Sequence, residues 1–204
     1  MQVFQAALGA FETNCFWFEH AGRGWLVDPG DDDVRAFLPE LGRVDVVLLT
    51  HGHVDHVLGL AAVRARHPAA RIVLPKADLV WFRKADLQAS MFGLRYIQVP
   101  EPDDLIDAPC ELDGIRVLPT PGHTPGSVSY YLPESGVCFS GDTLFAQGVG
   151  RTDFPGGSWT ALSRSIREQL YTLPDSTVVY PGHGPETTIA DERRSNPFVS
   201  GKRM

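Results

Sequence analysis

The sequence predicts an α+β fold in which two mixed β-sheets pack face to face beneath outer layers of helices. Short apolar runs rich in Val, Ile, Phe and Trp recur between Gly, Pro and Asp residues, which is the pattern of strands. Several neighbouring runs are joined by hairpin turns, and helical segments do not alternate strictly with them. This mixture favours two packed sheets over a doubly wound parallel sheet.

Strands in the first half of the chain are predicted from such apolar runs, and the turn at residues 21–24 marks a hairpin between the second and the third. The expected strands are Met1–Ala6, Cys15–His20, Trp25–Val27, Val44–Leu49 and Ile72–Leu74.

Three helices are expected between these strands. Val34, Phe37, Leu38 and Leu41 follow the i, i+3, i+4, i+7 spacing of an amphipathic helix, and the acidic run Asp31–Asp33 suits its positive end. The other two helices are expected near Val57–Arg66, which Pro68 ends, and at Lys76–Asp86.

The second half of the chain repeats this pattern. The expected strands are Gly114–Pro119, Ser127–Leu132, Val137–Phe139 and Thr177–Tyr180. Ser158 is predicted to cap a helix that carries Leu162, Ile166 and Leu170 on one face, and Thr187–Ser195 forms a closing helix. Because no linker or charge block interrupts the chain, residues 1–204 are expected to form one domain.

Composition limits the partners and the compartment. The chain has 18 basic and 25 acidic residues, so its formal charge of −7 disfavours a nucleic-acid partner. There is no secretory signal pattern at the start and no apolar run of about 18 residues, so we expect no membrane partner. The three cysteines are far apart, which predicts free thiols in a reducing compartment. We therefore expect a soluble cytoplasmic protein; its oligomeric state stays open.

The histidines indicate where the chemistry lies. Four predicted strands are each followed by a short polar segment with an ionisable residue: Thr50–His56, Gly122-His123, Gly141-Asp142 and Gly182-His183. Loops that follow strands often carry the binding and catalytic residues of a protein, because the sheet holds them in place. Four such ends in one small domain predict that these groups converge.

The segment Thr50–His56 reads Thr-His-Gly-His-Val-Asp-His and carries the strongest signal. His51 and His53 point the same way in an extended loop, whereas Asp55 and His56 follow in a helix and are directed to a second position. Imidazoles and carboxylates suit Zn, Fe or Mn. Together with His123, Asp142 and His183 the chain offers six or seven such ligands, which is more than a single tetrahedral ion needs. Two ions about 3.5–4 Å apart would use all of them.

Chance gives such a motif in roughly one chain in a thousand of this composition and length. Two histidines and an acidic pair outside these segments are expected to have no role in the site. His20 and His67 are expected at the surface, and Asp103-Asp104 in a solvated loop.

These segments together resemble the full ligand set of the metallo-β-lactamase superfamily. Gly150-Arg151-Thr152-Asp153-Phe154, Pro181–Pro185 and Asn196-Pro197-Phe198 are similar to the glyoxalase II-like branch, the hydroxyacylglutathione hydrolases, and especially to its short single-domain bacterial members. The resemblance covers nearly the whole chain. It implies an αββα four-layer sandwich with the metal ions at one edge.

The resemblance also implies a role for each residue. It assigns one ion to His51, His53 and His123, a second to Asp55, His56 and His183, and a bridging position to Asp142. Asp28 matches a carboxylate that orients a ligand histidine from behind. Arg151 lies where the family places a basic residue that anchors a substrate carboxylate, and an ordinary ion pair within the loop is the alternative for this side chain.

The implied activity is binuclear, metal-dependent thioester hydrolysis. Two divalent cations, Asp55, Asp142 and a bridging hydroxide sum to about +1, which favours a small anionic substrate and a hydroxide nucleophile at neutral pH. A thiolate leaves without a general acid, and the sequence has no Gly-x-Ser-x-Gly nucleophile. S-lactoylglutathione is the expected substrate type, with zinc as the first choice of metal and iron or manganese as alternatives. The helical region that holds glutathione in longer family members is expected to be absent.

A persulfide dioxygenase is the second candidate, since that branch is similar in Gly150–Phe154 but uses one Fe(II) on His51, His123 and Asp142. A secreted β-lactamase, a nuclease and a flavoprotein oxygen reductase fit less well. A lactonase and a non-catalytic metal-binding protein stay open. The sequence leaves the acyl group, the thiol carrier and the native metal undetermined.

Overall fold

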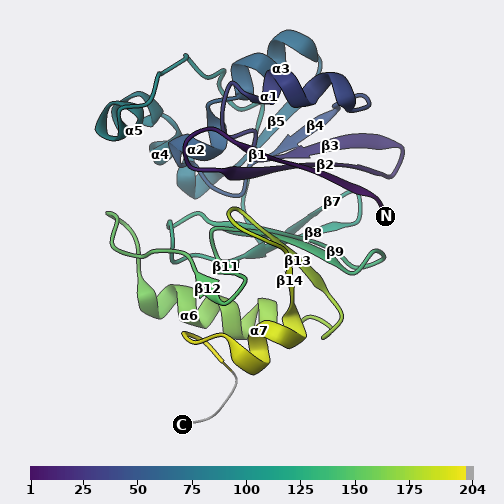
Figure 1. The fold of residues 1–204 in the computed structure, drawn as a ribbon, viewed down its shortest axis with the longest axis vertical. Coiled ribbons are helices and arrows are strands. Elements are labelled where there is room, and N and C mark those ends of the chain that lie inside the picture. Colours follow the sequence, from purple (N-terminus) through teal and green to yellow (C-terminus); the bar gives the residue numbers. More distant parts are fainter. Residues whose placement is uncertain (201–204) are drawn as a thin grey trace. The chain divides into compact units, whose positions relative to one another are not determined.

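The computed structural model describes residues 1–200, which separate into two compact units, Met1–Ile106 and the residues from Asp107 onward. Each unit is built on one six-stranded mixed sheet that carries helices (Figure 1). The expectation of a single domain stays a prediction. Among the described residues, no helix is long and apolar enough to cross a membrane.

The sheet of the first unit follows the order of the sequence, β1-β2-β3-β4-β5-β6. The strands are β1 Val3–Leu8, β2 Thr13–His20, β3 Arg23–Val27, β4 Val46–Leu48, β5 Arg71–Pro75 and β6 Asp104–Ile106. The pairs β1–β2 and β2–β3 are antiparallel, whereas β3 to β6 pair in parallel. The carboxyl ends of β3, β4 and β5 therefore meet at one edge of this sheet.

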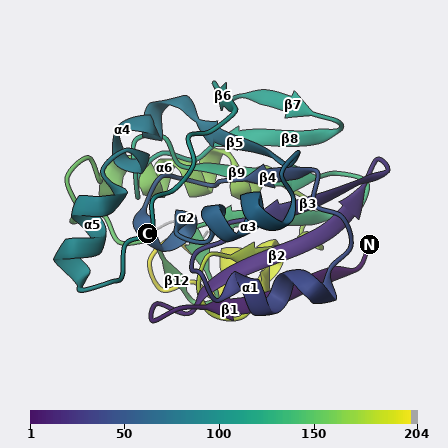
Figure 2. The ribbon, with the colours of Figure 1, turned by 90° about the horizontal axis from the view of Figure 1, so that it is seen from above.

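The helices of this unit are α1 Val34–Phe37, α2 Val54–Val57, α3 Leu60–Arg66, α4 Leu79–Phe82 and α5 Ala85–Phe92. Of these, α1 and α3 lie on one face of the sheet (Figure 1). Seen from above, α3 lies over the strands, whereas α5 lies to one side of them (Figure 2). Trp17, Leu26 and Val47 from the sheet share one buried apolar cluster with Val34 and Val63 from α1 and α3. Full burial of such a side chain contributes about 1.5–3 kcal/mol, so this cluster fixes the helices on the sheet.

The sheet of the second unit has the order β14-β13-β10-β9-β8-β7. Its strands are β7 Cys110–Leu112, β8 Ile115–Pro119, β9 Val128–Leu132, β10 Val137–Gly141, β13 Val178–Pro181 and β14 Thr187–Thr188, and β11 Leu144–Phe145 pairs with β12 Gly148–Val149 as a separate hairpin. Only β10–β13 is parallel. The helices α6 Trp159–Glu168 and α7 Ile189–Ser195 cover one face of this sheet (Figure 1).

The α6 helix begins as its sequence predicts but ends earlier. Ser158 is its N-cap, and the Ser158 hydroxyl accepts a hydrogen bond from the Ala161 amide at 3.3 Å. Leu162 and Ile166 on α6 are fully buried in one apolar cluster, and Leu170 joins this cluster from a 3₁₀ turn, Leu170–Thr172, that follows the helix.

Several expected elements have different bounds. The first predicted helix ends early because Pro39 has no amide hydrogen, and a 3₁₀ turn, Leu38–Glu40, follows α1. The second is divided at Gly59, whose amide donates to the Pro29 carbonyl and where a Cβ would lie 2.5 Å from the Asp31 carbonyl oxygen. Asp103-Asp104 is not a simple solvated loop, because Asp104 begins β6 and Asp103 accepts the Ile72 amide hydrogen.

Candidate metal centre

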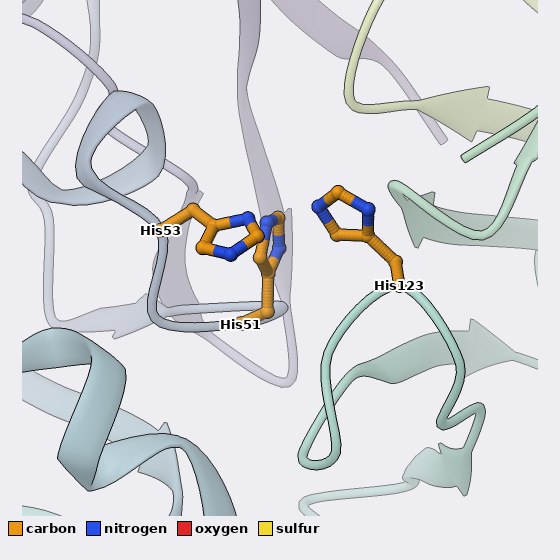
Figure 3. Close-up of side chains that lie close together, drawn as sticks. All are labelled: His51, His53 and His123. Carbon is orange, nitrogen blue, oxygen red and sulfur yellow. The ribbon is translucent and has the colours of Figure 1, made fainter. Parts of the chain in front are cut away.

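The loop after β4 presents two imidazoles to the same side. The His51 and His53 ring centroids are 4.9 Å apart at an interplanar angle of 80°, and Figure 3 shows both rings on this loop. His53 has an extended backbone and occupies the N-cap position of α2, so the chain turns into a helix directly after it. The ring of His56, in that helix, lies 4.1 Å from the ring of His51. Within each of these two pairs, ligand nitrogens lie within 4.8 Å of one another.

Asp28 holds this loop from the end of β3. Its buried carboxylate accepts hydrogen bonds from the Thr50 amide at 2.8 Å and from the Thr50 hydroxyl at 2.7 Å. His56 Nδ1 lies 3.0 Å from Asp28 Oδ2, and His51 Nδ1 lies 3.0 Å from the Thr50 hydroxyl oxygen. A proton on Nδ1 of each imidazole suits these two oxygens and would leave the lone pair of Nε2 for a metal ion.

Asp55, in the first turn of α2, is placed beside His56. Asp55 Oδ2 lies 3.6 Å from His56 Nε2, and the hydroxyl of buried Thr13 donates to the same oxygen at 3.3 Å. An oxygen and a nitrogen at this separation can share one cation. The first unit thus brings together all four ligands predicted in Thr50–His56.

The second unit brings together the other three predicted ligands. Asp142 Oδ2 lies 3.5 Å from His123 Nε2 and 3.5 Å from His183 Nε2, so the same carboxylate oxygen is close to both imidazoles. The parallel pairing of β10 with β13 sets Gly141 against Pro181, and the Gly182 amide donates to the Gly141 carbonyl at 2.9 Å. This pairing places the strand ends that carry Asp142 and His183 next to each other.

The His123 ring extends from the loop after β8 (Figure 3), and a backbone group orients it. His123 Nδ1 donates to the Arg151 carbonyl oxygen at 2.8 Å, which again presents Nε2 as the ligand atom. Gly150 packs the two segments together, since a Cβ there would lie 1.9 Å from the Asp142 carbonyl oxygen. Sequence reasoning missed this role of the Arg151 carbonyl, because no residue type encodes it.

The Arg151 side chain forms the loop ion pair that the sequence left as an alternative. Its guanidinium makes two hydrogen bonds to the Asp153 carboxylate, at 2.7 and 2.6 Å, and stacks 3.9 Å above the Phe154 ring. These bonds lower the pKa of Asp153 to about 2. Asp153 therefore stays charged at every ordinary assay pH.

The motif Asn196-Pro197-Phe198 holds the β11–β12 hairpin. The side-chain Nδ2 of Asn196 donates to the Gly148 carbonyl at 3.0 Å and to the buried Glu192 carboxylate at 2.7 Å. Glu192 in turn accepts from the Gln147 amide at 3.0 Å. This motif therefore braces the hairpin that leads into Gly150 and Arg151.

The cysteines are not placed as nucleophiles. Burial raises the pKa of Cys138 to about 12 and, with the nearby Asp28 charge, raises the pKa of Cys15 well above its usual value. Burial and then Asp107 also raise the pKa of Cys110, which is only half-buried. Since the thiolate is the reactive form, both buried thiols should be inert at neutral pH.

Alkylation should therefore reach only Cys110 in the native protein. At pH 8 we expect mass spectrometry to find one iodoacetamide adduct per native chain and three in denaturant, with unchanged activity in the singly modified protein. Loss of activity in step with modification of Cys15 or Cys138 would contradict this assignment.

The donor set fits divalent transition metals. It consists of imidazoles and carboxylates, and the Nδ1 atoms of His51, His56 and His123 each face an acceptor oxygen. This is the arrangement found behind metal-ligating histidines, because it fixes the tautomer and the ring orientation. Asp28, Thr50 and the Arg151 carbonyl provide it in this chain.

The comparisons with known proteins identify the family. The family model of the metallo-beta-lactamase superfamily matches residues 8–183. Hydroxyacylglutathione hydrolase GloC from Haemophilus influenzae is 40% identical over 204 residues, which cover 95% of each chain. The crystal structure of TTHA1623 in a di-iron-bound form matches with a TM-score of 0.89 at 38% identity, covering 96% of this chain and 100% of that one.

A further structural neighbour is ETHE1 from Myxococcus xanthus, with a TM-score of 0.79 and 30% identity over 100% of this chain and 86% of that chain. These similarities confirm the expected metallo-β-lactamase fold, with its two mixed sheets and helices. The chain belongs to the metallo-beta-lactamase superfamily of metal-dependent proteins.

Proposed function

We propose that seven residues hold two divalent cations. The first ion takes His51, His53 and His123, the second takes Asp55, His56 and His183, and Asp142 is shared by both. Two observations support this proposal. Each unit places its own share of these donors at ligand-to-ligand distances, and a 38% identical neighbour contains two iron ions. Zinc is our first choice of metal, and iron and manganese are the alternatives.

We further propose that the protein hydrolyses small anionic thioesters, S-lactoylglutathione among them. The observation that carries this is the double donor set in a chain 40% identical to a hydroxyacylglutathione hydrolase. When bound, a pair of divalent cations lowers the pKa of water toward 7 and polarises a carbonyl oxygen. The chain itself contributes fixed ligand geometry, because Asp28 and the Arg151 carbonyl keep a proton on each Nδ1 that they face.

No side chain is needed to protonate the leaving group. A thiol has a reference pKa near about 8.5, so it departs as a thiolate near neutral pH, whereas an amine would need a general acid. The ligand carboxylates of Asp55 and Asp142 offset only half of the charge of two divalent cations, so the site favours an anionic substrate.

Arg151 is proposed to bind a substrate carboxylate, in competition with Asp153. Asp153→Asn should release the guanidinium and lower KM for an anionic thioester by at most about five-fold with kcat unchanged, because an exposed ion pair is weak. Arg151→Ala should raise KM, and Arg151→Lys should raise it less, because lysine keeps the positive charge. Equal KM values in all three variants would show that the pair only shapes the loop.

Thiol release from S-lactoylglutathione by the metal-loaded protein tests the function directly. A thiol reagent would follow the rate, with His53→Ala and the chelated wild-type protein as matched controls. We expect release by the wild-type protein and background rates in both controls. A wild-type rate equal to that of His53→Ala would refute thioester hydrolysis.

Iron-dependent persulfide dioxygenation is the second candidate, and the similarity to ETHE1 leaves it open. That reaction would need one iron, on His51, His123 and Asp142. Metal analysis separates the two candidates. Two ions per chain favour hydrolysis, whereas one iron with persulfide-dependent oxygen uptake favours oxidation.

A further inference from the structure

The loop that carries His51 and His53 rests on a segment with no role in the donor set, residues 76–92. Asp78 is fully buried, and its Oδ2 accepts a hydrogen bond from the Gly52 amide at 2.9 Å. Gly52 is the single residue between the two histidines. The contact therefore fixes the peptide that joins them.

Gln88, in α5, holds the next amide of the same loop. Its Oε1 accepts from the Val54 amide at 3.2 Å, and its Nε2 donates to the Trp81 carbonyl at 2.8 Å. The two side chains thus secure the amides on either side of His53. The His53 ring also meets the Trp81 ring edge to face, with centroids 6.0 Å apart.

Gly52 packs against this segment with no space for a side chain. A Cβ at Gly52 would lie 2.7 Å from the Asp78 carbonyl oxygen and 2.8 Å from the Phe82 amide nitrogen. Because both neighbours are backbone atoms, the loop and the segment can approach this closely only at a glycine.

The placement of Asp78 is unusual for its position. It occupies the N-cap position of α4, where an aspartate normally accepts a hydrogen bond from its own helix. The Asp78 side chain makes no such capping bond and accepts from Gly52. Burying a carboxylate costs free energy unless its hydrogen bonds compensate. Because Asp78 uses its buried carboxylate for the Gly52 amide and not as a cap of α4, we infer that the conformation of the Gly52 loop is what this side chain stabilises.

We propose that Asp78 and Gln88 are positioning residues that hold His51 and His53 in their ligand-presenting arrangement before metal binds. This inference rests on the proposed metal pair and extends it to residues outside the donor set. Loss of the Asp78 acceptor leaves the Gly52 amide without its partner and allows the peptide between the histidines to rotate. The ion assigned to His51 and His53 should be the one affected.

Zinc affinity of the full-length protein tests the proposal without any measurement of turnover. Competition with a chromophoric chelator gives the dissociation constants of the two zinc-binding steps. The visible spectrum of the cobalt-loaded protein reports the ligand geometry. Asp78→Ala should weaken one of the two steps at least about 10-fold and alter that spectrum, as loss of an outer partner typically does. Asp78→Asn keeps an acceptor oxygen for Gly52 and should stay within about three-fold of the wild type.

Asp45→Ala is the matched control. Asp45 Oδ2 accepts from the Gly24 amide at 2.9 Å, a carboxylate-to-glycine bond of the same kind at the opposite end of the first sheet. Its removal should leave both zinc affinities unchanged. If Asp78→Ala fails to fold, Asp78→Asn and Gln88→Leu provide the comparison, and Gln88→Leu should weaken the same step.

A lower thermal midpoint of apo Asp78→Ala with unchanged zinc affinities would overturn the proposal, because it would show a purely structural role. Equal losses in Asp78→Ala and Asp78→Asn would also overturn it, since charge would then matter and the hydrogen bond would not. Failure of the proposed function is distinguishable, because a wild-type protein that binds two ions and releases no thiol would still allow this comparison.

Discussion

Replacing Asp142 with alanine is expected to lower kcat for thioester hydrolysis by more than about 100-fold. One Asp142 oxygen lies 3.5 Å from both His123 Nε2 and His183 Nε2, and its loss removes the donor proposed for both ions. Substitution of an outer partner already costs about 10–100-fold, so loss of a shared ligand should exceed that range. Steady-state kinetics with metal analysis of the same sample would measure the effect.

Asp175→Ala is a suitable control for this experiment. It removes an exposed carboxylate of the same unit that pairs with Arg193, and it should leave kcat and metal content unchanged. An Asp142→Ala protein that keeps two ions and wild-type kcat would refute the bridging assignment. One that keeps a single ion with measurable turnover would favour a mononuclear centre.

Asp28→Ala should have the next largest effect, with zinc affinity approaching 100-fold weaker than in the wild type. The carboxylate accepts two hydrogen bonds from Thr50 and faces His56 Nδ1 at 3.0 Å. All of these groups are buried, and each donor left unsatisfied costs about 1–3 kcal/mol, so the apoprotein should also unfold at lower denaturant concentration.

Asp28→Asn separates the charge from the geometry. Asp28 has a φ of 47°, in the left-handed region that asparagine tolerates better than alanine does. The asparagine variant keeps one acceptor oxygen, so it should retain the hydrogen bond from the Thr50 amide and part of the stability, while His56 loses its anionic partner. Alanine and asparagine variants that both match the wild type in zinc affinity would exclude Asp28 from the metal centre.

Local signals predicted much of the fold. The Ser158 cap and the apolar face of α6 were readable because both depend on residues within a few positions of each other. The hairpin of β11 and β12 and the short β14 were not predicted. Two-residue strands are too short for any periodicity, and their pairing depends on Asn196 and Glu192, which lie more than 40 positions from Gly148 and Gln147.

The proposed ligands and Asp28 were identifiable from the sequence, whereas the positioning residues Asp78 and Gln88 were not. His51, His53, Asp55 and His56 lie in one short segment whose spacing is informative, and the other three follow strands that end in glycine. Asp78 and Gln88 sit in an ordinary helical sequence, where an acid and an amide usually face solvent. Only the tertiary contacts with Gly52 and Val54 distinguish them.

The hydrogen bond between His123 and the Arg151 carbonyl has an evolutionary consequence. Because a peptide oxygen orients the imidazole, any residue type at position 151 can supply that oxygen. The guanidinium can therefore be exchanged for another side chain while the tautomer of His123 is maintained. Selection on the side chain at position 151 and selection on the orientation of His123 can therefore proceed independently.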